Sequence, residues 1–155
     1  MSSASSERKL YLDDIAVGQE FQSGEQCVDA DQMVAFAAQY DPQPFHTDAE
    51  AARNTFFQGL AASGWYTMSI TMNLIVRSVP FVHGIIGSGG EISWPRPTRP
   101  GDVLHVKSKV IEIRPSQSKP DRATVFLESL TYNQNGELAQ KLLAKLLAFR
   151  KERSR

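Results

Sequence analysis

Residues 61–79 constrain the fold more than any other part of the chain, because they form its longest uninterrupted helical candidate and carry little charge. Apolar side chains occur along the whole segment, at Trp65, Met68, Ile70, Met72, Leu74, Ile75 and Val79. A helix that is apolar on most sides has to be buried on most sides. We therefore expect this helix to lie at the centre of the fold, with a sheet wrapped around it.

From Gly87 onward the pattern changes to that of β-strands, in which apolar and polar side chains alternate. The apolar positions of this part are Ile92, Trp94, Leu104, Val106, Val110, Val125, Phe126, Leu127 and Leu130. Asn135-Gly136 is a two-residue hairpin signal, so it predicts an antiparallel connection between the last two strands.

Residues 137–150 carry two conflicting signals. Their leucines fall at helical spacing and most of their residues are good helix formers. Leu142, Ala144, Leu146 and Ala148 also alternate, as in a strand. We predict a strand, because the hairpin turn places this segment against residues 123–132 and tertiary pairing can override helix propensity.

The first half of the chain adds a strand and two short helices. Residues 20–28 read as the strand, and Asp29 with Gln32 forms a capping-box pattern at the start of a helix that ends at the Asp41 loop. A second short helix is expected over residues 49–53. Together the elements predict an α+β fold, with a curved antiparallel sheet around one central helix.

Composition is that of a single domain with a real core. The chain has 155 residues, 41% of them hydrophobic. We assign residues 9–155 to one domain and expect residues 1–8, which are serine-rich, to form a disordered leader. Since 17 basic residues balance 17 acidic ones and no basic face stands out, we expect no nucleic-acid partner.

Cysteine usage and hydropathy point to the cytoplasm. Cys27 is the only cysteine, so the chain cannot form an internal disulfide. An apolar N-terminal signal and a stretch of membrane-spanning length are both absent from the sequence, and no membrane association is expected. Cys27 lies in a strand-like segment and is expected to be a small core residue.

Asp41 and His46 are the residues that most suggest chemistry. They share one short segment stiffened by Pro42 and Pro44, each of which fixes its own φ and restricts the residue before it. A carboxylate held near an imidazole can bind and deprotonate a water molecule. A turn device at Asp41 and a pocket-edge role for His46 are the structural alternatives.

Around these residues the chain resembles a known family. The resemblance rests on Asp41-Pro42-Gln43-Pro44-Phe45-His46 with the small residues Ala51 and Ala52, on Gly59 to Gly64, and on Gly90-Glu91-Ile92-Ser93-Trp94-Pro95-Arg96-Pro97 with Arg99-Pro100-Gly101-Asp102. These motifs are similar to those of the MaoC-like (R)-specific enoyl-CoA hydratases, of the hot-dog superfamily. The similarity extends from about residue 11 to residue 150.

The resemblance implies a hydro-lyase that interconverts enoyl-CoA and 3-hydroxyacyl-CoA, with the CoA thioester as substrate and no separate cofactor. It assigns Asp41 and His46 to the water and the proton, and the backbone N–H of Gly64 to the enolate oxygen. A helix N-terminus suits a developing oxyanion on physical grounds as well, although Gly64 could also serve close packing of the helix. Ser69 matches a serine that the family often keeps beside the substrate, and a mid-helix serine can instead bond its own backbone.

Three positions depart from the family pattern. Tyr40 replaces a glycine, Gln43 replaces an asparagine, and Ser63 stands where a histidine is common. Gln43 and Ser63 keep hydrogen-bonding capacity, and we count Ser63 among the substrate-binding candidates. Two other functions stay open on this fold: an acyl-CoA thioesterase and a non-catalytic acyl-binding subunit.

The remaining polar residues suggest no second site. His83 and His105 are scattered and lack a neighbouring carboxylate cluster, so no metal site is expected. Hot-dog domains generally pair, which predicts a homodimer with the Asp41 loop at the subunit boundary. Arg96 and Arg99 are possible contacts for CoA phosphates. The residues that could line an acyl tunnel, or simply fill the core, are Phe56, Phe57, Trp65 and Met68.

Overall fold

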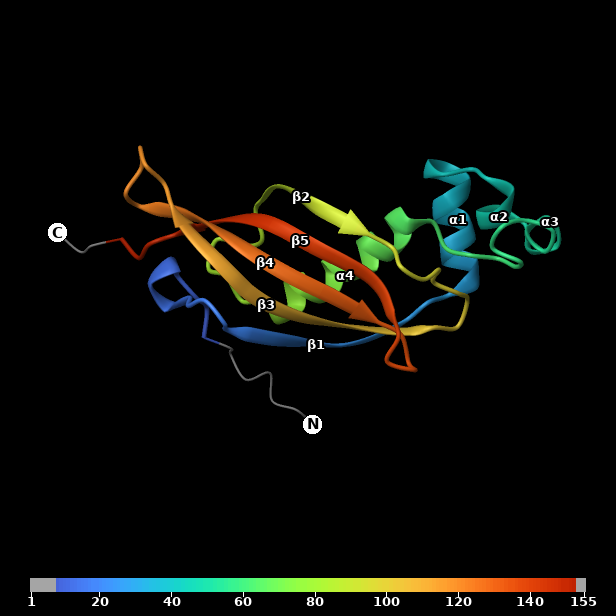
Figure 1. Cartoon of the computed structure of the whole chain (residues 1–155), viewed down its shortest axis with the longest axis horizontal. Coiled ribbons are helices and arrows are strands. Elements are labelled where there is room, and N and C mark those ends of the chain that lie inside the picture. Colours follow the sequence, from blue (N-terminus) through green and yellow to red (C-terminus); the bar gives the residue numbers. More distant parts are fainter. Residues whose placement is uncertain (1–7, 153–155) are drawn as a thin grey trace.

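A curved, five-stranded antiparallel sheet wraps around one long helix in the computed structural model, which describes residues 8–152 (Figure 1). The strands are β1 (Glu20–Cys27), β2 (Gly87–Ser93), β3 (Val103–Pro115), β4 (Arg122–Tyr132) and β5 (Leu138–Phe149). The helices are the 3-10 turn η1 (Leu12–Asp14), then α1 (Ala30–Tyr40), α2 (Pro44–Thr47), α3 (Ala49–Ala52) and the long α4 (Gly64–Ser78). The predicted α+β class and central helix are confirmed. The predicted leader lies outside the described residues except for Arg8.

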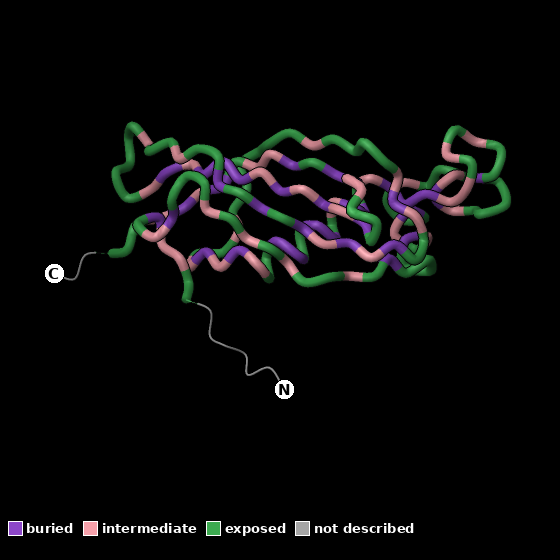
Figure 2. The backbone as a smooth tube through the Cα atoms, turned by 60° about the horizontal axis from the view of Figure 1, so that its bottom comes forward, coloured by how far each residue is buried: buried purple, intermediate pink, exposed green. Residues whose placement is uncertain are grey.

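The strand order in the sheet is β1-β3-β4-β5-β2, so β1 and β2 form its two edges. Long antiparallel pairs join β3 to β4 and β4 to β5. The predicted strand at residues 137–150 is confirmed: Ala123 pairs with Ala148 and Leu127 with Ala144 in the β4–β5 ladder. Burial alternates along these central strands (Figure 2).

The connection between β4 and β5 is longer than the two-residue hairpin that the sequence predicts. Residues 133–137 form it, and the Asn133 side chain accepts hydrogen bonds from the backbone N–H groups of Asn135 and Glu137. Gly136 takes the left-handed φ of 72° that the turn requires. The Asn-Gly pair thus marks the turn correctly, but Asn133 sets its length.

One face of α4 provides much of the core. Ile70, Leu74 and Ile75 are buried and belong to the same hydrophobic cluster as Leu104 and Leu127 of the sheet. The sequence predicts burial of α4 on most sides, but the opposite face of the helix is not buried. Trp65, Met72 and Val76 are exposed there. Another expectation is wrong: Cys27, at the end of β1, is exposed and not part of the core.

The glycine-rich run at the start of β2 allows this strand to pack closely against β5. Gly89 and Gly90 adopt φ values of 151° and 159° beside a β-bulge that opposes β5. A side chain on Gly90 would collide with the Leu143 carbonyl oxygen, so the close approach of the two backbones requires glycine there.

Helices α1, α2 and α3 gather at one end of the sheet, next to the start of α4 (Figure 1). Asp29 caps α1 as predicted, accepting a hydrogen bond from the Gln32 backbone N–H. The segment predicted as a loop after Asp41 contains the one-turn helix α2, with Pro44 in its first turn. None of the described helices is long and apolar enough to cross a membrane.

Candidate active site

Asp41 and His46 meet at the junction of α1 and α2. Asp41 is the C-cap of α1, and His46 is the third residue of α2, so the two prolines between them bring the side chains together. His46 Nε2 lies 3.3 Å from Asp41 Oδ2. The structure therefore joins the two residues that the sequence singles out.

The other ring nitrogen of His46 fixes its tautomer. Nδ1 lies 2.8 Å from the carbonyl oxygen of Ala61. A carbonyl oxygen can only accept, so Nδ1 carries a proton and donates it to this bond. The ring is only 6% exposed, which keeps it in this orientation. Nε2 is consequently the nitrogen that can exchange a proton beside Asp41.

Asp41 is held as a carboxylate. Its Oδ1 accepts a hydrogen bond from Gln43 Nε2, and its Oδ2 accepts one of 2.7 Å from the Ser63 hydroxyl. Burial raises the pKa of Asp41, but the bonds from Gln43 and Ser63 and the charge of His46 outweigh burial and lower that pKa below its ordinary value. A carboxylate stabilised in this way is a weak base.

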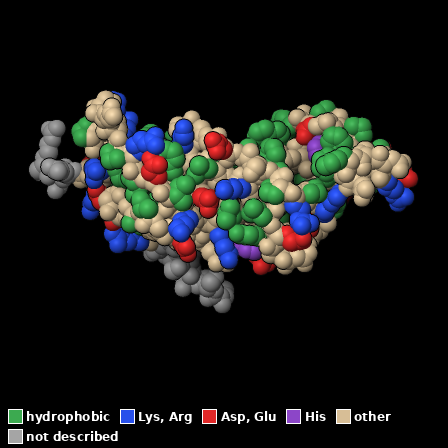
Figure 3. Space-filling view, viewed as in Figure 1, with side chains coloured by type: hydrophobic (Ala, Val, Ile, Leu, Met, Phe, Trp, Pro, Cys, Tyr) green, Lys and Arg blue, Asp and Glu red, His purple; other side chains and the backbone are tan. Residues whose placement is uncertain are grey.

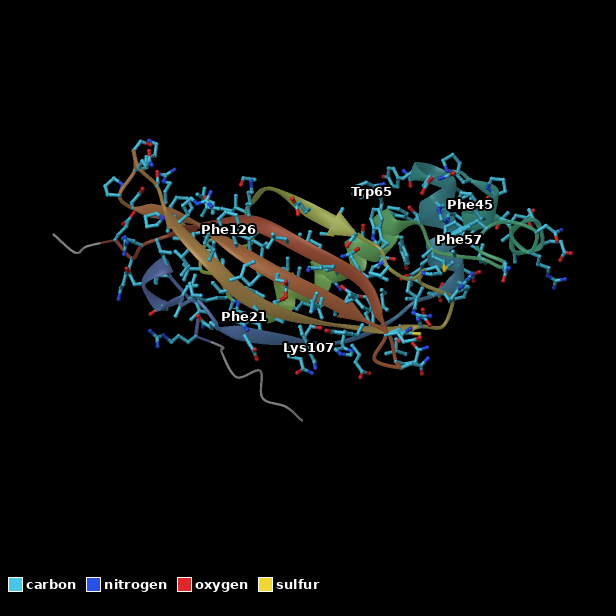
Figure 4. All side chains as sticks on the ribbon, viewed as in Figure 1. Phe21, Phe45, Phe57, Trp65, Lys107 and Phe126 are labelled. Carbon is cyan, nitrogen blue, oxygen red and sulfur yellow. The ribbon has the colours of Figure 1, made fainter. Side chains whose placement is uncertain are left out.

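A pocket of about 550 Å³ opens beside this pair. Aromatic side chains form much of its wall: Phe45, Phe56, Phe57, Trp65 and Trp94. Phe45, Phe57 and Trp65 lie together near α2 and the start of α4, whereas Phe21, Lys107 and Phe126 lie along the sheet (Figure 4). Hydrophobic side chains gather on the surface at this end of the molecule (Figure 3). The pocket suits a ligand with an apolar part and one reactive polar group.

Gly64 starts α4 at the pocket wall and lies under the indole of Trp94. A Cβ atom on Gly64 would lie 2.6 Å from Trp94 Cε2. The indole is fixed from the other side, because its Nε1 donates a hydrogen bond of 2.9 Å to Gln140 Oε1. The close-packing role of Gly64 is therefore real, with Trp94 as the packing partner.

Ser63 and Ser69 have separate roles. Ser63 is buried and caps α4 by accepting from the Trp65 backbone N–H, while its own hydroxyl donates to Asp41. It thus ties the start of the central helix to the carboxylate. Ser69 is exposed, donates to the Trp65 carbonyl and does not line the pocket of the single chain.

Replacing Ser63 by alanine removes both the helix cap and a hydrogen bond to an ionised group. We expect the free energy of unfolding at neutral pH to fall by about 1–3 kcal/mol, which chemical denaturation measures. The pKa of Asp41 should rise in this variant. A carboxylate with a lowered folded pKa stabilises the fold above its unfolded pKa, and this stabilisation is lost as pH falls through the folded pKa.

The difference between the wild type and Ser63→Ala should therefore be largest at neutral pH and shrink in acid. The helix-cap part of the loss should persist there. Ser69→Ala is the matched control, and because Ser69 is an exposed helix serine its effect should stay within about 0.5 kcal/mol. A Ser63→Ala loss that is the same at every pH would show that the bond to Asp41 contributes nothing.

The arginines expected near CoA phosphates have protein partners. Arg96 pairs with Glu137 at 3.0 Å, and Arg99 donates to backbone carbonyls of the segment before α4. Arg96 lines the pocket, but Arg99 does not.

The described residues hold no group of three metal-ligating side chains. His83 contacts the rings of Tyr11 and Phe149, and His105 stacks on Tyr132.

Sequence reasoning missed two parts of the site, the Ala61 carbonyl that binds His46 and the indole of Trp94 over Gly64. It also named Arg99 for CoA phosphates, whereas this side chain binds backbone carbonyls. Each is a contact between residues distant in sequence. The only local signal was the glycine at position 64.

Residues 14–130 match the family model described as a MaoC like domain. The chain therefore belongs to the MaoC-like domain family. The uncharacterized protein YdeM of Bacillus subtilis (strain 168) is 31% identical over 127 residues, which cover 81% of this chain and 89% of YdeM.

Solved structures agree with this assignment. A MaoC-like dehydratase from Rhodospirillum rubrum is 54% identical, with a TM-score of 0.91 over 93% of this chain and 99% of that one. An (R)-hydratase from A. caviae is 27% identical, with a TM-score of 0.69 over 87% of this chain and 97% of that one. The hot-dog fold predicted from the sequence is confirmed.

Proposed function

We propose that the protein adds water across the C2–C3 double bond of an enoyl-CoA thioester, and catalyses the reverse dehydration, with Asp41 and His46 as its catalytic pair. The observation that carries this proposal is the geometry of the pair: a buried imidazole with one free nitrogen, 3.3 Å from a carboxylate, at the wall of an aromatic pocket. Family membership and the likeness to an (R)-hydratase support the same reaction.

The first step is attack by water. A water molecule beside the pair would donate one hydrogen bond to His46 Nε2 and another to an oxygen of Asp41. As its oxygen bonds to C3, its proton passes to Nε2, and the π electrons of the double bond move toward the thioester oxygen. Asp41 remains ionised and stabilises the imidazolium that forms.

The second step returns the proton. The enolate oxygen needs a hydrogen-bond donor, and the Gly64 N–H at the start of α4 is the donor we assign, since a helix N-terminus offers unpaired N–H groups and a partial positive charge. Reformation of the thioester carbonyl then lets C2 take the proton from His46 Nε2. The water supplies both the C3 hydroxyl and the C2 hydrogen, so the atoms balance.

The test is an assay of purified protein with short, medium and branched trans-2-enoyl-CoAs. Loss of the conjugated thioester absorbance without release of free thiol supports hydration and reveals the preferred acyl group. Release of thiol would assign a thioesterase instead. No change in either signal with any substrate would favour a non-catalytic acyl-binding subunit.

We also propose that two copies of the chain pair through α4 and the edge strand β2. Trp65, Met72 and Val76 lie on one face of α4 and are exposed, with Trp65 also lining the pocket. A second copy would cover this apolar face and extend the sheet at β2, whose outer edge is open. The partner would then close one side of the pocket.

Val76→Glu should convert the dimer to a monomer and lower activity, because it places a charge on this apolar face. Sedimentation velocity measures the change. Ile111→Glu is the control, since Ile111 is a similarly exposed apolar residue on β3, away from α4. A wild-type protein that sediments as a monomer, or a Val76→Glu variant that stays dimeric, would contradict this arrangement.

A further inference from the structure

The Arg99 side chain donates hydrogen bonds to three backbone carbonyls of the segment that precedes α4. Its Nη1 donates to the carbonyl oxygens of Gly59 at 3.0 Å and Leu60 at 3.2 Å, and its Nη2 donates to that of Phe57 at 2.6 Å. A planar guanidinium can serve several acceptors in one fixed geometry, which a lysine ammonium cannot reproduce. The side chain is thus committed to the backbone, and it is not free to bind a ligand phosphate.

The segment that Arg99 holds has little regular structure of its own. Residues 57–60 lie between α3 and α4, and Gln58 has a φ of 54°, which side-chain-bearing residues adopt only when their surroundings enforce it. Carbonyl oxygens that converge on one point repel each other unless a cation lies between them. The guanidinium is that cation, and it acts together with backbone bonds from Gly59 N–H to the Ala52 carbonyl and from Ala61 N–H to the Phe45 carbonyl.

This segment and the residue that follows it both contact the catalytic histidine. The Phe57 ring lies 5.8 Å from the His46 ring and 5.0 Å from the Phe45 ring, measured between centroids. The residue after Leu60 is Ala61, whose carbonyl accepts the proton of His46 Nδ1. Arg99 therefore holds the peptide next to the one that fixes the His46 tautomer.

Arg99 is itself anchored to the sheet. Its backbone N–H donates to Asp102 Oδ2 at 2.8 Å, and Asp102 Oδ1 accepts from Gln134 in the β4–β5 connection. Asp102 is buried and lies just before β3. The turn at residues 99–102 thus connects the rigid sheet to the irregular segment beside His46.

We propose that Arg99 is a positioning residue: it holds residues 57–60 so that the Ala61 carbonyl and the Phe57 ring direct His46 Nε2 toward Asp41 and the pocket. The inference rests on the proposed function only for its effect on rate. The effect on the His46 tautomer stands whatever the reaction is. Without the guanidinium, the carbonyls separate and the Nδ1–H bond to Ala61 is lost or lengthened.

The test compares Arg99→Ala and Arg99→Lys with Arg122→Ala, in the presence and absence of millimolar guanidinium chloride. Arg122 is the control because, like Arg99, it is a half-buried arginine with fixed side-chain partners, here Asp121 and the ring of Phe149, but it lies near the far end of the sheet. Nitrogen NMR of the His46 imidazole reports its tautomer without any need for activity. His46→Gln identifies the His46 signals.

We expect Arg99→Ala to lose the single Nδ1–H tautomer of His46 and to lower kcat about 10- to 100-fold with a small change in KM, since displacement of a catalytic group by about 1 Å has this effect. Free guanidinium should restore both the tautomer and kcat in Arg99→Ala. Arg99→Lys should stay impaired, and Arg122→Ala should keep both properties of the wild type.

Guanidinium rescue separates positioning from simple destabilisation, because a denaturant cannot restore a variant that is only less stable. A wild-type tautomer in folded Arg99→Ala would overturn the proposal, as would a failure of guanidinium to restore the tautomer. If the wild type hydrates no enoyl thioester, the proposed function fails, but the NMR result still decides the role of Arg99.

Discussion

His46→Asn should lower the hydration rate constant kcat by about 100- to 10,000-fold, the usual contribution of a general acid–base residue. Asparagine places an amide N–H close to the position of Nδ1, so the bond to the Ala61 carbonyl can persist. Nothing in the new side chain replaces Nε2, which is the atom beside Asp41. The chemistry is therefore removed while the local structure is largely kept. Steady-state kinetics with the preferred enoyl-CoA measures the effect.

Asp41→Asn should cause a loss of similar size, with a lower stability. Asp41 accepts bonds from Gln43 and Ser63, and each bond to a charged group contributes about 1.5–3 kcal/mol. His83→Asn is the control for both variants, because His83 is exposed and lies outside the pocket. Full activity in folded His46→Asn would rule out proton transfer by His46.

Gly64→Ala should destabilise the fold by about 1–3 kcal/mol, the usual cost of an added methyl group in a filled space. The new Cβ would meet the Trp94 ring at 2.6 to 2.8 Å, and the indole cannot move away without breaking its bond to the buried Gln140. Hydration should fall too, since the start of α4 and the Gly64 N–H would shift. Chemical denaturation measures the stability.

A double-mutant cycle with Trp94→Ala isolates this contact. Trp94→Ala is destabilising by itself because it leaves Gln140 without its donor, but the cycle cancels that effect. In the Trp94→Ala background, Gly64→Ala should be neutral or slightly stabilising, because alanine favours helix over glycine by about 1 kcal/mol. An equal loss in both backgrounds would mean that Gly64 is required for its backbone conformation or N–H, not for the contact with Trp94.

The parts of the fold that sequence predicts well are those in which local pattern and long-range pairing agree. The α1 cap follows from Asp29 alone, and the strand nature of β5 follows from alternation together with the turn before it. The helical propensity of β5 is overridden, since Leu146 and Ala148, two residues apart, both face the core only when this segment is extended.

The candidate pair was predictable for a similar reason. Asp41 and His46 are close in sequence, and the prolines between them leave few conformations. Trp94 over Gly64 and Arg99 on residues 57–60 join positions about 30 to 40 residues apart, so no local pattern encodes them. The sequence predicts burial for the exposed face of α4 because its residues are apolar, and apolar character along a helix does not show which face the sheet covers.

The most direct test of the central claim is hydration in water labelled with heavy oxygen, analysed by mass spectrometry before the reverse reaction exchanges the label. We expect the label in the C3 hydroxyl of an intact 3-hydroxyacyl-CoA, an unlabelled thioester carbonyl and no free CoA, with the signal lost in His46→Asn. Label in the carboxylate of a released acid would contradict the account, and so would an unlabelled substrate after full incubation with every enoyl-CoA of the panel.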